Sequence, residues 1–333
     1  MNERERLHAT LNNLPTDFLP RTPVLMHLVA DQAGISYGEF ARNGAALAES
    51  NIALIEQFGF EQLDVLSDPW CEAADFGGKI TYLDDTVPLC EHVLANTTDL
   101  SALTNPDPHT SPRMSNRLRS IKRFAAYSQG RYDITGWIEG PAAAAGGLRG
   151  ISNFLMDTAM DPAFTAALLD VVTDNAIAFA LAQIQAGATT IGIGDAIASQ
   201  IGPAFYETLD LPRTQRIVDA IHDAGGFARL HICGDINHLL PLIAQTGIDM
   251  LDCDWQVDLA AARAAMPTTA LGGGVDPVLV LNAAPDEIRA AVAKAYQTAG
   301  NPYVVMAGCE IPRGTPDANF AALCEPISYT HRE

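Results

Sequence analysis

The fold is decided by residues 189–271, in which short apolar runs of strand length recur: TTIGI (189–193), ARLHI (228–232), IDML (248–251) and TAL (269–271). Segments with helical periodicity separate these runs, for example PLIAQTG before Ile248 and VDLAAARAAM before Thr269. Strands that alternate with helices predict a parallel sheet with helices packed outside it.

The same alternation extends to both sides of this stretch. Four further runs have the same character: residues 24–28, 63–66, 133–137 and 303–306. Eight strand–helix units without a break in composition predict an α/β fold, a (β/α)8 TIM barrel that forms one domain over residues 1–333. We expect one extra helix in the first twenty residues. The segment 68–131 contains the proline-broken piece TNPDPHTSPRMSN, so we expect an elaborated loop over the barrel mouth after the second strand.

Composition and charge exclude several classes of protein. Of 333 residues, 48% are apolar and 18% are charged, as in soluble globular enzymes. The net charge of −20 repels phosphate backbones and anionic lipids, so we expect no nucleic-acid partner. No apolar run approaches the ~20 residues of a membrane span. The start, MNERERLHATLNN, lacks the apolar core of a signal peptide, so we expect a cytoplasmic protein.

The polar residues at the ends of the predicted strands point to a metal. His231 and Cys233 end the fifth run and project to the same face, since they are two residues apart on a strand. Cys309 follows the eighth run and reaches the same barrel mouth. One imidazole and two thiolates select zinc, and three protein ligands leave a fourth position open for a substrate. The alternative is that these are buried thiols and a hydrogen-bonded histidine.

Several motifs resemble the uroporphyrinogen decarboxylase superfamily. These are LHICG (230–234), GID (247–249), GGVDP (273–277) and AGCEIPRGTP (307–316), together with Gly140-Pro141 and LRG (148–150). Within it, the sequence resembles the corrinoid-dependent branch, such as the methylcobamide:coenzyme M methyltransferases. The resemblance implies a (β/α)8 barrel, zinc bound by His231, Cys233 and Cys309, and a corrinoid (cobalamin) as methyl carrier, either free methylcobalamin or a corrinoid protein.

The chain departs from the decarboxylase branch after the first strand. True decarboxylases have an arginine-rich segment there, whereas residues 26–36 contain no arginine. Asp68 does match the position of their catalytic aspartate, although an Asp before a helix can also be an N-cap. A metal-free decarboxylase that uses Asp68 to stabilise a protonated pyrrole is therefore the alternative function. A non-enzymatic corrinoid- or metal-binding accessory protein is the third.

Two other acids follow strand ends. Glu72 and Asp195 are candidate catalytic residues, either as a fourth zinc ligand or as the group that holds His231 in its metal-binding tautomer. The alternative for each is a solvated loop acid.

A basic cluster stands out in this acidic chain. Its members recur at helical spacing: Arg113, Arg117, Arg119, Lys122 and Arg123. We expect a solvated face of an amphipathic helix, with docking of an acidic partner as the alternative.

Zinc suits methyl transfer, because a thiol at the open position becomes a thiolate that can attack the methyl group of methylcobalamin. In the reverse direction, a methylated substrate gives its methyl group to the corrinoid. The small acceptor or donor, whether a thiol, tetrahydrofolate or a methylated compound, stays open.

Overall fold

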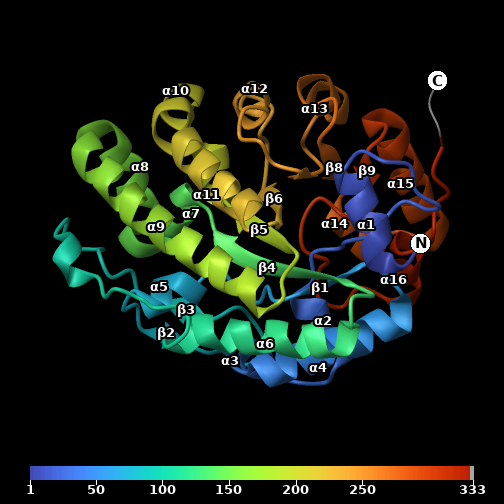
Figure 1. Ribbon diagram of the computed structural model, residues 1–333, viewed down its shortest axis with the longest axis horizontal. Coiled ribbons are helices and arrows are strands. Elements are labelled where there is room, and N and C mark those ends of the chain that lie inside the picture. The colour runs from blue at the N-terminus through green and yellow to red at the C-terminus, as the bar shows by residue number, and fades with distance from the viewer. Residues whose placement is uncertain (331–333) are drawn as a thin grey trace.

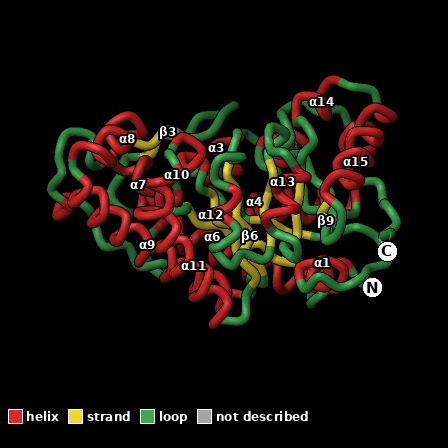
Figure 2. The backbone as a smooth tube through the Cα atoms, turned by 90° about the horizontal axis from the view of Figure 1, so that it is seen from above, coloured by secondary structure: helices red, strands yellow, loops and turns green. Residues whose placement is uncertain are grey.

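The computed structural model describes residues 1–330, and its seven parallel strands curl into a ring with helices outside it (Figures 1 and 2). Each strand pairs with the next one in the order β1-β4-β5-β6-β7-β8-β9. The strands are β1 (Gln62–Asp64), β4 (Asp133–Glu139), β5 (Thr190–Gly194), β6 (Phe227–Ile232), β7 (Met250–Cys253), β8 (Ala270–Gly273) and β9 (Tyr303–Val304). Seven of the eight predicted strands are confirmed, with bounds that differ by a few residues.

The predicted first strand, residues 24–28, is wrong. An irregular segment just before it closes the ring: Thr22 N donates to Val305 O at 3.1 Å, and Glu61 N donates to Arg21 O at 3.0 Å. Pro20 and Pro23 have no N–H group, so this segment cannot form a regular ladder. It nevertheless bonds to both edges of the sheet, beside β9 and β1. The chain then enters helix α2 (His27–Gln32).

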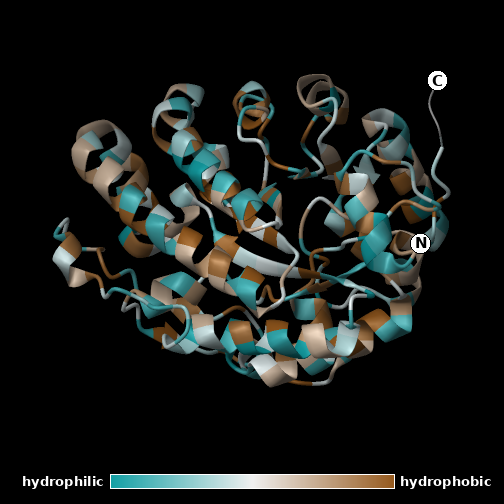
Figure 3. Ribbon diagram, in the orientation of Figure 1, coloured by the Kyte–Doolittle hydropathy of each residue, from teal (hydrophilic) through white to brown (hydrophobic). Residues whose placement is uncertain are grey.

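The helices form the outer layer, and the predicted N-terminal helix is α1 (Glu3–Leu11), which begins with a capping box between Asn2 and Glu5. Hydrophobic and hydrophilic residues alternate along these helices (Figure 3). The others are α3 (Tyr37–Arg42), α4 (Gly44–Phe58), α5 (Cys71–Asp75), α6 (Pro112–Ser128), α7 (Pro141–Arg149), α8 (Ile151–Met160), α9 (Pro162–Ala186), α10 (Pro203–Phe205), α11 (Leu211–Asp223), α12 (Leu240–Ile243), α13 (Leu259–Ala265), α14 (Pro277–Asn282), α15 (Pro285–Ala299) and α16 (Asp317–Leu323).

The elaborated loop is shorter than predicted. Segment 68–131 holds α5, a small antiparallel pair β2 (Ile80–Thr81) and β3 (Leu89–Cys90), and then α6. Helix α6 packs between α4 and α9 as the ordinary return helix to β4 (Figure 1). The extra structure is therefore confined to the part before α6.

Helix α9 differs from the expectation that no segment could span a membrane. By length and composition alone it is a candidate span, but a core helix passes the same test. Here α9 packs against α6 and α11. Its Asp170 and Asp174 pair with Arg213 at 2.8 Å and Arg216 at 2.6 Å. These contacts account for α9 as a helix of the outer layer.

The two faces of the strands differ in polarity. In β6, Leu230 and Ile232 are buried on one face, whereas Arg229 and His231 project into the ring. Arg229 reaches across the interior to Gln62 on β1. The ring is therefore filled by polar side chains as well as apolar ones, and the buried polar groups must satisfy one another.

Glu61 holds the segment that closes the ring, residues 20–23, to the sheet, and this contact generates a stability prediction. Its fully buried carboxylate accepts hydrogen bonds from Arg21 Nη2 at 2.7 Å and Arg6 Nη1 at 2.8 Å. Glu61→Gln replaces the charged partner of Arg21 by a neutral amide, whereas Arg6 keeps its ion pair with Asp17, so we expect the free energy of unfolding to fall by about 3 kcal/mol. Urea denaturation measures this change.

The matched control is Glu49→Gln. Glu49 forms an exposed ion pair with Arg123 at 3.2 Å, so we expect a loss of less than about 1 kcal/mol. Equal effects of the two substitutions would contradict the role given to Glu61.

Candidate active site

A buried guanidinium group organises the interior of the ring. Arg229 donates from Nε to the two carboxylate oxygens of Asp252 at 2.8 and 2.9 Å, and from Nη1 to Gln62 Oε1 at 2.7 Å. Burial opposes ionisation of Asp252, but Arg229 and His231 hold the pKa of this carboxyl below its ordinary value. Asp252 is therefore a carboxylate inside the barrel.

Asp252 also orients His231. The Nδ1 atom of His231 lies 3.0 Å from Asp252 Oδ2. Because a carboxylate only accepts hydrogen bonds, Nδ1 carries a proton, and Nε2 is the ring nitrogen that can bind a metal. A carboxylate behind a histidine is the common outer support of a zinc ligand.

The Nε2 atom of His231 points to two sulfur atoms. It lies 3.1 Å from Cys233 Sγ and 3.7 Å from Cys309 Sγ, and the two sulfur atoms are 3.5 Å apart. In a tetrahedral zinc site the ligand atoms are separated by about 3.5–3.8 Å. Two of the three separations lie in this range, and the one between His231 and Cys233 is shorter, at 3.1 Å, so the three residues fit such a metal once this contact lengthens. The hydrogen bond between the two thiols lowers the pKa of Cys309 to about 4 and raises the pKa of Cys233 above its ordinary value, so without a metal only one of the two sulfur atoms is a thiolate. Among residues 1–330, this is the group of His, Cys, Asp and Glu side chains that could hold a metal ion.

A cavity of about 220 Å³ opens beside these three residues. Three carboxyl groups and the indole of Trp137 are part of its wall. The lining residues are Val24, Met26, Leu66, Asp68, Pro69, Trp137, Glu139, Gly194, Ala196, His231, Cys233, Cys309 and Glu310.

Glycines on β5 make room for the indole of Trp137. A Cβ atom at Gly192 would lie 2.1 Å from Trp137 Cε3, and one at Gly194 would lie 2.9 Å from its Nε1. The position of Trp137 in the cavity wall therefore depends on the absence of side chains on the neighbouring strand.

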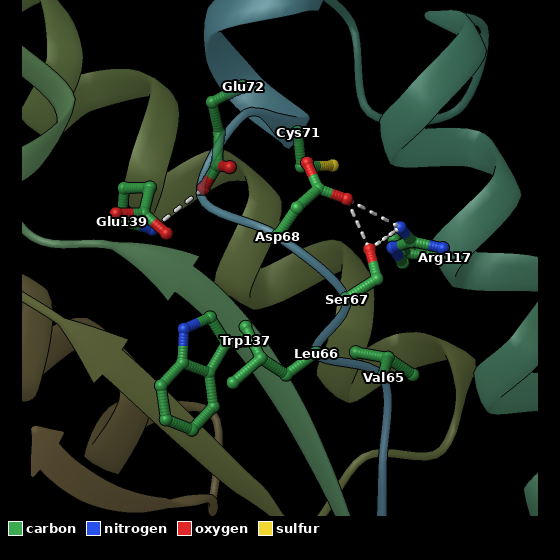
Figure 4. A pocket seen from close by; sticks show the side chains of 9 residues that line it. All are labelled: Val65, Leu66, Ser67, Asp68, Cys71, Glu72, Arg117, Trp137 and Glu139. Carbon is green, nitrogen blue, oxygen red and sulfur yellow. Dashed lines mark hydrogen bonds and ion pairs between the residues drawn. The ribbon is translucent and has the colours of Figure 1, made fainter. Parts of the chain in front are cut away.

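Asp68 also lines the cavity and faces two arginines, of which Figure 4 shows Arg117. Its Oδ2 accepts from Arg113 Nη2 at 2.6 Å and lies 3.6 Å from Arg117 Nη2. Burial opposes ionisation, but the two guanidinium groups keep the pKa of Asp68 below its ordinary value. The N-cap of α5 is Trp70. The alternative from the sequence, in which Asp68 is the N-cap of the following helix, is therefore wrong.

With the fold and this geometry in view, comparisons with known proteins decide the family. The profile of the uroporphyrinogen decarboxylase (URO-D) family matches residues 2–328. The chain belongs to the uroporphyrinogen decarboxylase family. The methylcobamide:CoM methyltransferase MtbA of Methanosarcina mazei is 31% identical, over 97% of this chain and 96% of its own. The uroporphyrinogen decarboxylase of Anaeromyxobacter dehalogenans is 26% identical, over 88% of this chain and 87% of its own.

A solved structure supports the same assignment. A methyltransferase from Methanosarcina mazei superposes with a TM-score of 0.89 at 25% identity, and 97% of each chain is covered. The resemblance to this family and to its methyltransferase branch is therefore confirmed, as is the barrel-like α/β fold.

Within this family fold, Glu72 and Asp195 do not support His231 as predicted. Glu72 Oε1 accepts from the backbone N of Glu139 at 2.8 Å. Asp195 Oδ1 accepts from Ala143 N at 2.7 Å, at the first turn of α7. Both side chains are buried, so neither is a solvated loop acid. The structure gives the supporting position to Asp252 instead.

The basic cluster is also different from the predicted solvated face. Arg113 and Arg117 are only 4% and 3% exposed, because they turn inward from α6 to Asp68. Only Arg119, Lys122 and Arg123 lie on the surface. The cluster is divided between the inside and the outside of the protein, so it is not one docking surface.

Two residues were missed by the sequence analysis. Asp252 was visible at the end of a strand, but only the pairing of β6 with β7 places it opposite His231. Glu139 could have been found, because β4 continues two residues past Trp137 and the two-residue period puts both side chains on the inner face.

The contact between Asp252 and His231 generates a prediction about metal binding. Asp252→Asn removes the charge that fixes the tautomer of His231, so we expect zinc affinity to fall about 10- to 100-fold. Competition with a chromophoric chelator measures this affinity.

Asp195→Asn is the control, because Asp195 is also a buried acid at a strand end but bonds to α7. We expect zinc affinity within about threefold of the wild type for this variant. A larger loss in Asp195→Asn than in Asp252→Asn would restore the original role of Asp195.

Proposed function

We propose that this enzyme is a zinc-dependent methyltransferase that moves a methyl group between a corrinoid and a small molecule, in the simplest case a thiol acceptor. The observation that carries the proposal is the convergence of His231 Nε2, Cys233 Sγ and Cys309 Sγ at one wall of a cavity. The name of the relatives from Methanosarcina, methylcobamide:CoM methyltransferase, supports a corrinoid and a CoM-type acceptor for the chemistry.

Each residue of the site has a role in this proposal. His231, Cys233 and Cys309 would hold zinc, which supplies a Lewis acid that makes a coordinated thiol a thiolate at neutral pH. Asp252 keeps the proton of His231 on Nδ1, and Arg229 keeps Asp252 ionised. The small substrate would enter through the cavity and take the fourth position on the metal, which no protein side chain fills in this proposal.

The corrinoid must present its methyl group from outside. A cavity of about 220 Å³ is too small for a corrin ring, so the carrier docks at the barrel mouth, either as free methylcobalamin or on a corrinoid protein. Either direction of transfer is compatible with this arrangement.

A cytoplasmic location is part of the proposal. The six cysteines are all free thiols, and the proposed site needs two of them reduced. A reducing compartment preserves such thiols.

The first prediction concerns metal content. We expect about one zinc per chain in the purified protein, and loss of the zinc in Cys233→Ser and Cys309→Ser, because each removes one of three ligands. Elemental analysis of the dialysed protein measures the zinc content per chain. Cys90→Ser is the control, since Cys90 lies outside the cluster, and it should keep its zinc. Full zinc retention in both ligand variants would end the assignment.

The second prediction separates the proposal from its alternatives. We expect the enzyme to transfer methyl groups from free methylcobalamin to a thiol, which is measured as a change in the absorption spectrum of the corrinoid. We expect no useful decarboxylation of uroporphyrinogen. The cavity beside the cluster is lined by no Lys or Arg among the described residues, and the small pocket that shares Glu139 with it is lined by Arg117, so a polyanionic substrate has few partners for its carboxylates there. Decarboxylation at the rate of a true decarboxylase would favour the metal-free alternative. Zinc binding without methyl turnover would favour an accessory protein.

A further inference from the structure

The two sulfur atoms of the candidate metal site are close enough to react with each other. Cys233 Sγ and Cys309 Sγ are 3.5 Å apart. The two atoms of a disulfide are about 2.0 Å apart, so a closure of about 1.5 Å would join them. In the part of the chain that the structure describes, residues 1–330, the other four cysteines are free thiols without a sulfur partner. The site is therefore the place where two thiols of this protein can be oxidised together.

The backbone around the pair leaves room for this closure. Cys233 lies just beyond the end of β6 and Cys309 lies beyond the end of β9, so neither belongs to the hydrogen-bonded ladder of the sheet. Gly234 has space around it, because a Cβ atom there would lie 3.7 Å from the nearest side chain. Gly308, in contrast, is tightly packed, because a Cβ atom there would lie 2.6 Å from Trp255 N. We infer that Cys233 moves toward a fixed Cys309.

The pair is also within reach of a small oxidant. Both cysteines are half-buried and line the cavity of about 220 Å³. A cavity that admits a small thiol also admits hydrogen peroxide, which is smaller. A peptide disulfide such as oxidised glutathione is too large to enter it as a whole. The size of the cavity therefore favours a small hydroperoxide as the oxidant.

We propose that this site is also a redox switch, in which a small hydroperoxide joins Cys233 and Cys309 in a disulfide and the protein loses its zinc. The inference rests on the proposed function, because it assumes that the two thiolates hold the metal. It goes further by assigning a regulation to the same residues.

The oxidation proceeds in two balanced steps. One thiolate attacks the peroxide, the O–O bond breaks, and the sulfur becomes a sulfenic acid while hydroxide leaves. The second thiolate attacks this sulfur, forms the S–S bond and displaces a second hydroxide. Two protons from solvent turn the hydroxides into water, and two electrons have passed from sulfur to the peroxide. His231 is then the remaining ligand of the three, which is too few to retain zinc.

The short distance between the two sulfur atoms makes the switch reversible. A sulfenic acid with a thiol beside it condenses to a disulfide, which a reductant reopens. A sulfenic acid without such a neighbour is oxidised further to a sulfinic acid, which a thiol reductant does not restore. A single-cysteine variant should therefore be oxidised irreversibly, whereas the wild type should recover.

The test titrates the zinc-loaded, full-length protein with hydrogen peroxide. A chromophoric chelator follows the released zinc, and the free thiols are counted after denaturation. We expect two thiols to be lost for each zinc released, and dithiothreitol with added zinc to restore both. A protease that cuts before aspartate separates Cys233 from Cys253 at Asp235, so mass spectrometry of the digest identifies the joined cysteines.

Cys90→Ser is the matched control, because Cys90 is also a half-buried cysteine but lies outside the cluster. It should release zinc and recover like the wild type. Burial raises the pKa of Cys90 to about 11, so this residue stays a thiol, and we expect it to react at least about tenfold more slowly than the pair. Cys233→Ser and Cys309→Ser should each leave a cysteine that dithiothreitol does not recover after peroxide.

Two results would overturn the inference alone: zinc-loaded protein in which Cys233 and Cys309 react no faster than Cys90, or oxidation of the pair to sulfinic acid without a disulfide. If the purified protein binds no zinc at all, the proposed function is wrong and the inference falls with it. The outcomes therefore separate an error in the regulation from an error in the function.

Discussion

Burying the charge of Arg229 is the constraint on which the interior of this barrel depends. An unpaired guanidinium group there would cost several kcal/mol, so its donors must find acceptors on other strands. Asp252 on β7, Gln62 on β1 and the carbonyl oxygen of Thr22 in the closing segment supply them. One side chain thus links three parts of the ring that are far apart in the sequence. It fixes their relative positions more specifically than apolar packing would, because hydrogen bonds have direction.

The same network connects the stability of the barrel to its chemistry. Asp252 accepts from Arg229 on one side and from His231 on the other, so the arrangement that neutralises the buried cation also sets the tautomer of the candidate metal ligand. The next residues after Asp252 and His231 in this network are Cys233 and Cys309. They follow the ends of their strands and line the cavity. The polarity of the interior therefore changes along the barrel axis, from an ion pair inside the ring to a sulfur-rich site at its mouth.

The sequence predicts the repeating part of this structure well and the tertiary part poorly. Seven strands and the convergence of His231 with two cysteines follow from local periodicity and from the rule that strand ends share one mouth. Local patterns could not show that Asp252 orients His231, since only strand register decides this. Arg113 and Arg117 were misjudged for a similar reason. Helical spacing separates the two faces of α6, but it does not reveal a buried carboxylate that draws charged residues inward.

The packing of Trp137 against Gly192 has a consequence for how substrate range could change in this family. Gly192 does not line the cavity, yet the indole that does line it rests where a Cβ atom of residue 192 would have to be. A methyl group added there would force the ring out of its present position in the cavity wall. Variation at a position that never contacts the ligand can thus reshape the pocket, so relatives with identical lining residues need not accept the same molecules.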